Sequence, residues 1–270
     1  MKILREALVR AGRVAVLVYC GLVVLGCVAA NKMIFQPQPA SYGGGLPGLL
    51  MAAAADDTPL AVLHLPNPAA RHTVFYFHGN AEDLGDTLPL LQQLHAAGFA
   101  VLSFDYRGYG RSAGKPSEEN VYADTQAVLA FARARLGIAS EQMIAVGRSV
   151  GSGAAVELAV RSPLAGLVLI SPLASAVRVM TRVKLLPFDR FDNLAKASRV
   201  RCPSLVLHGT ADEVIAFVHG RNLFEKLPAP KRNVWIERAG HNDIFAIAGD
   251  RILGEIAAFG QNLPASTVAR

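Results

Sequence analysis

Short apolar runs alternate with longer segments of helical periodicity along most of this 270-residue chain. The runs are rich in Val, Leu, Ile and Phe, and turn-forming residues separate them. They predict eight strands, at 49–53, 60–65, 73–77, 100–104, 143–146, 166–171, 204–208 and 233–236. Apolar residues with helical spacing predict helices at 84–97, 117–136 and 243–259, and a further helix after the strand at 143–146. The alternation indicates an α/β fold with a mostly parallel sheet and helices on both faces.

The sequence Gly147-Arg148-Ser149-Val150-Gly151 joins one of these apolar runs to an alanine-rich helical segment. This is the G-x-S-x-G pattern of a nucleophile elbow, in its strand-turn-helix context. A turn that sharp strains the serine backbone and leaves no room for side chains at the two glycines. The Val150 N–H then lies at a helix N-terminus, where it can stabilise an oxyanion. The alternative is a chance Gly/Ser turn.

Further polar residues follow other predicted strands, at the edge of a parallel sheet where functional groups gather. Asp212 comes after the strand at 204–208, with Glu213 as its rival, and His241 comes after the last strand. With Ser149 they stand in the chain order Ser, Asp, His. We expect His241 to act as the general base and Asp212 to orient it. The N–H of Asn80, in the loop after the strand at 73–77, is the predicted second oxyanion donor.

Three other polar residues near these loops are interpreted as structural. His78 is expected to hydrogen-bond nearby loops, and Asp105 to brace the loops around the site. Arg148 is expected to be a solvated side chain, with contact to an anionic acyl carrier or a phospholipid head group as its alternative. None of the three is assigned a chemical step.

The N-terminal segment differs from the rest of the chain. Residues 14–30 carry no charge and follow a basic segment, and their number lies near the lower limit of about 17 for crossing a bilayer. Residues 1–32 are therefore predicted to be a signal anchor or a signal peptide. The basic flank predicts membrane attachment through residues 14–30 and a periplasmic catalytic domain in a bacterium. The alternatives are lipidation of Cys27, in a lipobox-like sequence, and a buried core helix.

The rest of the chain is predicted to form one domain. Residues 33–48 are rich in Pro and Gly and indicate a linker. The catalytic domain is expected at 49–262, followed by a tail at 263–270. Because 52% of the residues are hydrophobic, a domain of this length can bury a large core.

Composition excludes several function classes. The net charge of +6 is not concentrated in a basic, aromatic-rich patch, so no nucleic-acid partner is predicted. The three cysteines offer no metal-ligand spacing, and Cys202 is interpreted as a buried structural thiol. No metal and no organic cofactor is implied.

Several blocks of sequence, covering about 73–259, resemble the α/β-hydrolase domain-containing protein 17 group. The blocks are His78-Gly79-Asn80-Ala81, Asp105-Tyr106-Arg107-Gly108-Tyr109-Gly110, Gly114-Lys115-Pro116-Ser117-Glu118, Gly147-Arg148-Ser149-Val150-Gly151, Ser171-Pro172-Leu173, His208-Gly209-Thr210-Ala211-Asp212-Glu213-Val214-Ile215 and Gly240-His241-Asn242-Asp243-Ile244. The resemblance implies an α/β-hydrolase fold and a membrane-attached serine hydrolase that removes palmitate from protein cysteines. It places the triad on Ser149, Asp212 and His241. The apolar N-terminus departs from that group, whose members carry a palmitoylated cysteine cluster there.

Together these features predict a membrane-anchored serine hydrolase that cleaves acyl esters or thioesters through a covalent acyl-enzyme. The substrate is expected to be a small ester, a lipid or an acylated protein. The short segment between the strands at 166–171 and 204–208 predicts a minimal lid, and its apolar residues are interpreted either as an acyl groove or as ordinary helix packing. The alternatives are a serine aminopeptidase-type peptidase and a non-catalytic, membrane-tethered binding protein.

Overall fold

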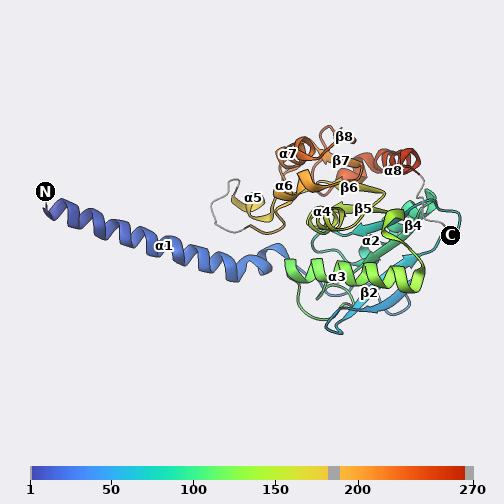
Figure 1. Cartoon of the computed structure of the whole chain (residues 1–270), viewed down its shortest axis with the longest axis horizontal. Coiled ribbons are helices and arrows are strands. Elements are labelled where there is room, and N and C mark those ends of the chain that lie inside the picture. Colours follow the sequence, from blue (N-terminus) through green and yellow to red (C-terminus); the bar gives the residue numbers. More distant parts are fainter. Residues whose placement is uncertain (1, 182–188, 265–270) are drawn as a thin grey trace.

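The computed structural model describes residues 2–181 and 189–264, apart from the side chains of several positions in the first helix and of residues 180–181. An eight-stranded sheet in the order β1-β2-β4-β3-β5-β6-β7-β8 forms its centre (Figure 1). The strands β1 and β2 pair antiparallel with each other, and β2 pairs antiparallel with β4, whereas all later neighbours are parallel. The strands are β1 (Leu49–Ala53), β2 (Pro59–Leu65), β3 (Thr73–Phe77), β4 (Ala100–Phe104), β5 (Met143–Arg148), β6 (Gly166–Ile170), β7 (Ser204–Gly209) and β8 (Lys231–Ile236).

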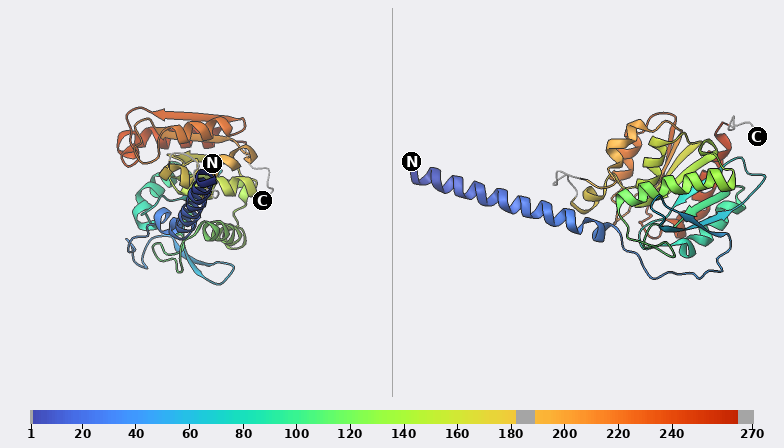
Figure 2. Two further views of the ribbon diagram at one scale, coloured as in Figure 1. Left: turned by 90° about the vertical axis from the view of Figure 1, so that its left-hand side faces the viewer. Right: turned by 60° about the horizontal axis from the view of Figure 1, so that its bottom comes forward.

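Helices cover both faces of the sheet (Figures 1 and 2). Apolar residues of α2 and α8 pack against one face, and those of α3, α4 and α7 pack against the other. The helices are α1 (Lys2–Ile34), α2 (Leu84–Ala96), α3 (Glu118–Phe131), α4 (Gly151–Arg161), α5 (Ala176–Thr181), α6 (Asn193–Lys196), α7 (Val218–Lys226) and α8 (Ile244–Asn262).

The alternation of side chains along each strand explains why the sheet is apolar throughout. In β3, Val74 and Tyr76 join the core on the side of α2 and α8, whereas Phe75 and Phe77 join the core on the other side. A parallel strand covered on both faces has no solvated side to give to polar residues. The burial of this sheet therefore follows directly from the apolar runs of the sequence.

All eight predicted strands are present, and the predicted α/β architecture, a mostly parallel eight-stranded sheet with helices on both faces, is confirmed. The last strand begins at Lys231, earlier than its apolar residues indicated, because Lys231 and Arg232 are edge-strand residues that keep their charged ends near solvent. Helix α3 ends at Phe131 and continues as one π-helical turn, Ala132–Leu136, before Gly137 in the left-handed region. The short helices α5 to α7 were not assigned from sequence.

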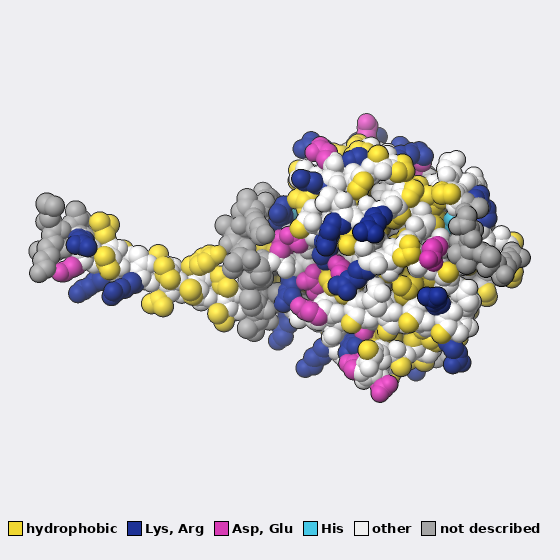
Figure 3. Space-filling model, in the orientation of Figure 1, with side chains coloured by type: hydrophobic (Ala, Val, Ile, Leu, Met, Phe, Trp, Pro, Cys, Tyr) yellow, Lys and Arg dark blue, Asp and Glu magenta, His cyan; other side chains and the backbone are white. Residues whose placement is uncertain are grey.

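The N-terminal segment forms one continuous helix, α1, that projects away from the sheet (Figures 1 and 2). Hydrophobic side chains lie exposed along it, beyond a basic first part (Figure 3). Among the residues that the structure describes, no helix combines the length with the apolar character that crossing a bilayer requires, so the predicted membrane helix is not found. The uncharged run at 14–30 is shorter than the ~20 apolar residues of a typical spanning helix. The side chain of Cys27 lies outside the described residues.

The chain enters the domain at the C-terminal end of α1. Ile34 and Phe35 are buried in the core, and the Phe35 ring packs edge-on against Phe191 with 5.8 Å between ring centroids. The following residues run along the domain to β1. The segment predicted as a linker therefore makes specific contacts with the domain at its start.

Candidate active site

The elbow between β5 and α4 has the strained geometry that its sequence predicts. Ser149 has a φ of 53°, in the left-handed region that a non-glycine residue rarely adopts. A Cβ at Gly147 would lie 2.6 Å from the Gly151 carbonyl oxygen, and one at Gly151 would lie 2.2 Å from the Phe77 carbonyl oxygen. Both contacts would be with backbone atoms, which cannot move away as a flexible side chain can. Glycine at these positions therefore lets strand, turn and helix approach closely around Ser149.

The structure brings together the three residues predicted to form a triad. The Ser149 hydroxyl oxygen lies 3.0 Å from His241 Nε2, and His241 Nδ1 lies 2.8 Å from Asp212 Oδ2. The loops after β5, β7 and β8 supply one residue each. These side chains thus form a continuous hydrogen-bonded chain from carboxylate to hydroxyl.

Asp212, rather than its neighbour Glu213, is the carboxylate that faces the histidine ring. Glu213 Oε2 accepts a hydrogen bond of 3.3 Å from the backbone N–H of His241 and makes none to the ring. Asp212 Oδ1 accepts from the backbone N–H groups of Val214 and Ile215, at 3.0 and 2.7 Å. These bonds fix the carboxylate while its other oxygen faces His241.

Asp212 also lies beside a second histidine, His208 of β7, whose Nε2 is 3.2 Å from Asp212 Oδ2. Burial opposes ionisation of Asp212, but hydrogen bonds from His208 and His241 outweigh it and hold the pKa of the carboxyl well below its usual range. Asp212 is therefore a carboxylate over the whole physiological pH range, as an orienting acid requires. Sequence reasoning did not single out His208 for this contact.

Two backbone N–H groups are available next to Ser149. In the described part of the chain, neither the Asn80 N–H nor the Val150 N–H has a hydrogen-bond acceptor. The Asn80 loop passes beside the elbow, since a Cβ at Gly79 would lie 3.7 Å from the Ser149 Cβ. Unpaired donors beside a nucleophile are suited to hold an oxyanion.

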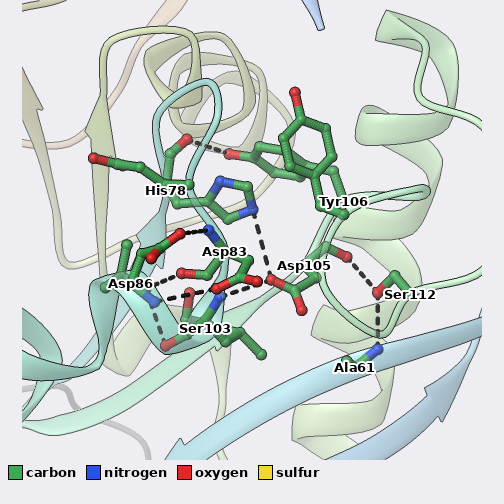
Figure 4. Close-up of polar contacts among 12 residues, drawn as sticks. Ala61, His78, Asp83, Asp86, Ser103, Asp105, Tyr106 and Ser112 are labelled. Atoms are coloured by element: carbon green, nitrogen blue, oxygen red, sulfur yellow. Dashed lines mark hydrogen bonds and ion pairs between the residues drawn. The ribbon is translucent and has the colours of Figure 1, made fainter. Parts of the chain in front are cut away.

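His78 and Asp105 lie close to each other, with 4.0 Å between His78 Nε2 and Asp105 Oδ1, and their contacts agree with their structural interpretation (Figure 4). His78 is fully buried, its ring stacks on Tyr106 at 4.1 Å, and its carbonyl accepts from the Tyr106 hydroxyl at 2.9 Å. Asp105 Oδ1 accepts from the Leu84 N–H at 2.8 Å, and Ser112 donates to the Asp105 carbonyl at 2.7 Å. These contacts tie the loops after β3 and β4 together.

Arg148 is not the solvated side chain that the sequence predicts. It pairs with Glu82 and lies over the Phe245 ring, 5.5 Å from the ring centroid. Only 15% of its side chain is exposed. Glu82 also accepts from the Gly79 N–H at 2.9 Å, so the pair links the elbow to the Asn80 loop.

Across residues 2–181 and 189–264, no group of three His, Cys, Asp or Glu side chains has the geometry to hold a metal ion. Cys202 is buried, and burial raises the pKa of its thiol to about 12. A thiol with that pKa is unreactive at neutral pH.

The chain is similar to known α/β-hydrolases. A family model described as serine aminopeptidase S33 matches residues 68–190. The α/β-hydrolase domain-containing protein 17B of Homo sapiens is 43% identical over 181 residues, which is 66% of this chain and 63% of that protein. The Xenopus laevis protein of the same name is 44% identical over 180 residues, 66% of this chain and 62% of that protein. The chain thus spans less than two thirds of the length of these relatives.

Solved structures show the same fold. An esterase of Pyrococcus furiosus superposes with a TM-score of 0.72 at 18% identity, covering 84% of this chain and 99% of the esterase. A monoacylglycerol lipase of Paleococcus ferrophilus gives a TM-score of 0.60 at 24% identity, over 74% of this chain and 98% of the lipase.

Fold and comparisons together define the class of this protein as an α/β-hydrolase. Within that class, the chain is related to the α/β-hydrolase domain-containing protein 17 group. These relatives are not bacterial periplasmic enzymes, and the predicted location in a bacterial periplasm on a membrane anchor, with lipidation as its alternative, is wrong. That prediction rests on the basic flank and the uncharged run of residues 1–32, outside the region that carries the family resemblance.

Proposed function

We propose that this protein is a serine hydrolase that cleaves acyl esters or thioesters with Ser149 as nucleophile, His241 as general base and Asp212 as orienting acid. The observation that carries the proposal is the hydrogen-bonded chain of 3.0 Å from Ser149 to His241 and 2.8 Å from His241 to Asp212. A serine hydroxyl is a weak nucleophile unless an adjacent base takes its proton.

The proposed reaction has two halves. His241 Nδ1 donates to Asp212, so Nε2 is the free acceptor that takes the Ser149 proton as the oxygen attacks the acyl carbon. The N–H groups of Asn80 and Val150 hold the negative charge that develops on the acyl oxygen. His241 then gives its proton to the departing alkoxide or thiolate. In the second half, His241 takes a proton from water, the hydroxide attacks the acyl-enzyme, and a carboxylic acid leaves as Ser149 regains its proton.

The proposed substrate class rests on the solved structures to which the chain is similar. The solved neighbours described as esterases and as a monoacylglycerol lipase favour acyl esters. The proposal includes thioesters of acylated proteins, which the same chemistry would cleave with a better leaving group. The predicted acyl groove falls partly on residues 182–188, outside the described residues.

The first prediction concerns Ser149→Ala. The wild-type protein is expected to react with a fluorophosphonate probe, and the variant is expected to take up no label. Ester turnover should fall by roughly 10⁴-fold or more, because the variant keeps only oxyanion stabilisation and binding. The control is the thermal unfolding temperature of the variant. It should equal or slightly exceed that of the wild type, because alanine can adopt the same strained backbone conformation as Ser149. Substantial turnover by the variant would reject the mechanism.

A peptidase is the second candidate, because the matching family model is described as a serine aminopeptidase. Such an enzyme needs a free carboxylate to bind the substrate amine. Glu82 is the acid beside the elbow, and Arg148 already pairs with it, which weighs against this candidate. Faster turnover of aminoacyl amides than of matched acyl esters would favour the peptidase. A wild-type protein that neither reacts with the fluorophosphonate probe nor turns over any of these substrates would favour the third hypothesis, a binding protein that keeps the fold.

A further inference from the structure

We propose that Tyr109 and the backbone of Gln36 are positioning groups for catalysis, because together they hold the side chain of Asn80 and thereby aim its N–H at the oxyanion. This inference rests on the proposed function, in which that N–H is one of two oxyanion donors. It assigns a catalytic consequence to the segment predicted as a linker, which lies far from the triad in sequence. We call residues 78–82 the oxyanion loop and residues 35–42 the strap.

Three donors converge on one oxygen of Asn80. The side-chain Oδ1 accepts from the Tyr109 hydroxyl at 2.7 Å, from the Gln36 N–H at 2.8 Å and from the Ala81 N–H at 3.0 Å. Because two of these donors are backbone N–H groups, the accepting atom must be the amide oxygen, and the orientation of the amide is fixed. The Gln36 N–H also lies 3.0 Å from the Tyr109 oxygen, which accepts it. Asn80, Tyr109 and Gln36 thus close a small triangle of hydrogen bonds.

The hydroxyl of Tyr109 is suited to this fixed role. Only 1% of the residue is exposed, and burial raises the pKa of the phenol above its usual value, so it remains a neutral O–H donor. Its ring is held in turn by His78, at 5.3 Å, and by Tyr106, at 5.8 Å between ring centroids. Because the Tyr109 hydroxyl has so little freedom to move, it fixes the position of the Asn80 amide to which it donates.

The strap is anchored on both sides of its contact with the oxyanion loop. Phe35 is 4% exposed and packs against Phe191. Ser41 donates its N–H to Asp83 Oδ2 at 2.7 Å, and Asp83 caps the start of α2, directly after the oxyanion loop. The strap therefore contacts both Asn80 and Asp83, the residue that follows the oxyanion loop.

These contacts predict a specific kinetic effect. Ala81 has a φ of 56°, so the loop holds a strained conformation just after the proposed oxyanion donor. Removing the Tyr109 hydroxyl would release the Asn80 amide and let the N–H drift from the oxyanion. The displaced N–H would stabilise the transition state less, because charge develops on the acyl oxygen only there. We therefore expect kcat to fall while KM changes little.

The test compares Tyr109→Phe, Asn80→Ala and the double variant in the full chain, with kcat measured per active site by fluorophosphonate titration. Complete loss of one oxyanion donor costs about 10²- to 10³-fold in kcat, so a displaced donor is expected to cost roughly 10-fold. If Tyr109 acts through Asn80, Tyr109→Phe will lower kcat roughly 10-fold in the wild-type background and have no further effect in the Asn80→Ala background. The same pattern is expected for Phe35→Ala, which loosens the strap.

The matched control is Tyr122→Phe, which removes the hydroxyl of a half-buried tyrosine, bonded to Glu118 at 2.7 Å, away from the oxyanion loop. It should leave kcat within about two-fold of wild type. A Tyr109→Phe variant with wild-type kcat would overturn the inference while leaving the proposed function in place. Equal losses in both backgrounds would also overturn it, because they would indicate a general structural effect. A wild-type protein without turnover or labelling would reject the proposed function and this inference together.

Discussion

At the scale of single residues, the orientation of His241 depends on one carboxylate. Asp212→Asn would offer an amide N–H₂ or oxygen to Nδ1 and would favour the wrong tautomer, leaving Nε2 protonated and unable to accept from Ser149. We expect kcat on a short acyl ester to fall roughly 10⁴-fold with the fold intact. Glu213→Gln is the control, because the Glu213 carboxylate accepts from the His241 backbone N–H and not from the ring, and it should change kcat by less than about 10-fold. Similar losses in both variants would show that the two acids share the role.

The same residues illustrate what sequence can and cannot predict at this scale. Ser149, Asp212 and His241 were predicted because each lies in a loop at a strand end, and because their order in the chain follows a known pattern. The Arg148–Glu82 pair could not be predicted, since its members lie 66 positions apart and no local pattern joins them. The side chain of Asn80 was missed for the same reason: its partners Gln36 and Tyr109 come from distant segments.

At the scale of elements, the surroundings of two helical glycines predict opposite effects of substitution by alanine on stability. A Cβ at Gly151, the first residue of α4, would meet the Phe77 carbonyl oxygen at 2.2 Å, whereas one at Gly254 in α8 would meet nothing within 4 Å. Gly151→Ala should therefore destabilise the fold by about 1–3 kcal/mol and lower kcat. Gly254→Ala should stabilise it by about 0.5–1 kcal/mol with kcat unchanged. Urea denaturation checks both, and an unaffected Gly151→Ala would contradict the close packing of the elbow.

Elements were predictable where burial follows a period. Every strand of this sheet carries an apolar run, and α2, α3 and α8 carry apolar stripes. Helix α7 was missed because its sequence, VHGRNLFEK, is largely polar and buries only His219, Gly220 and Leu223. Its position depends on packing against β7 and β8 rather than on its own pattern, so the tertiary structure determines it.

At the scale of the whole molecule, the antiparallel edge of the sheet is tied to the core by one cation. Arg107, in the loop after β4, pairs with Asp124 of α3 and with Asp56 in the turn between β1 and β2. The Asp124 carboxylate has no exposed area, whereas 59% of the Asp56 side chain is exposed. The two ion pairs therefore contribute differently to stability. The buried charge of Asp124 is compensated by Arg107, whereas Asp56 can interact with water instead. The sequence block around Arg107 marked it as part of the family resemblance but gave no indication of its partners.

This difference gives a prediction about stability. Arg107→Met leaves a buried, unpaired carboxylate and should lower the free energy of unfolding at pH 7 by about 3–5 kcal/mol, whereas Asp56→Asn should have a much smaller effect. Burial raises the pKa of Asp124 even beside Arg107. A folded-state pKa above the unfolded value makes the penalty largest at high pH and relieves it as pH falls through the folded pKa. The deficit of Arg107→Met relative to wild type, measured by urea denaturation, should therefore shrink between pH 7 and pH 5. An equal deficit at both pH values would mean that Arg107 stabilises the fold by packing rather than by neutralising Asp124.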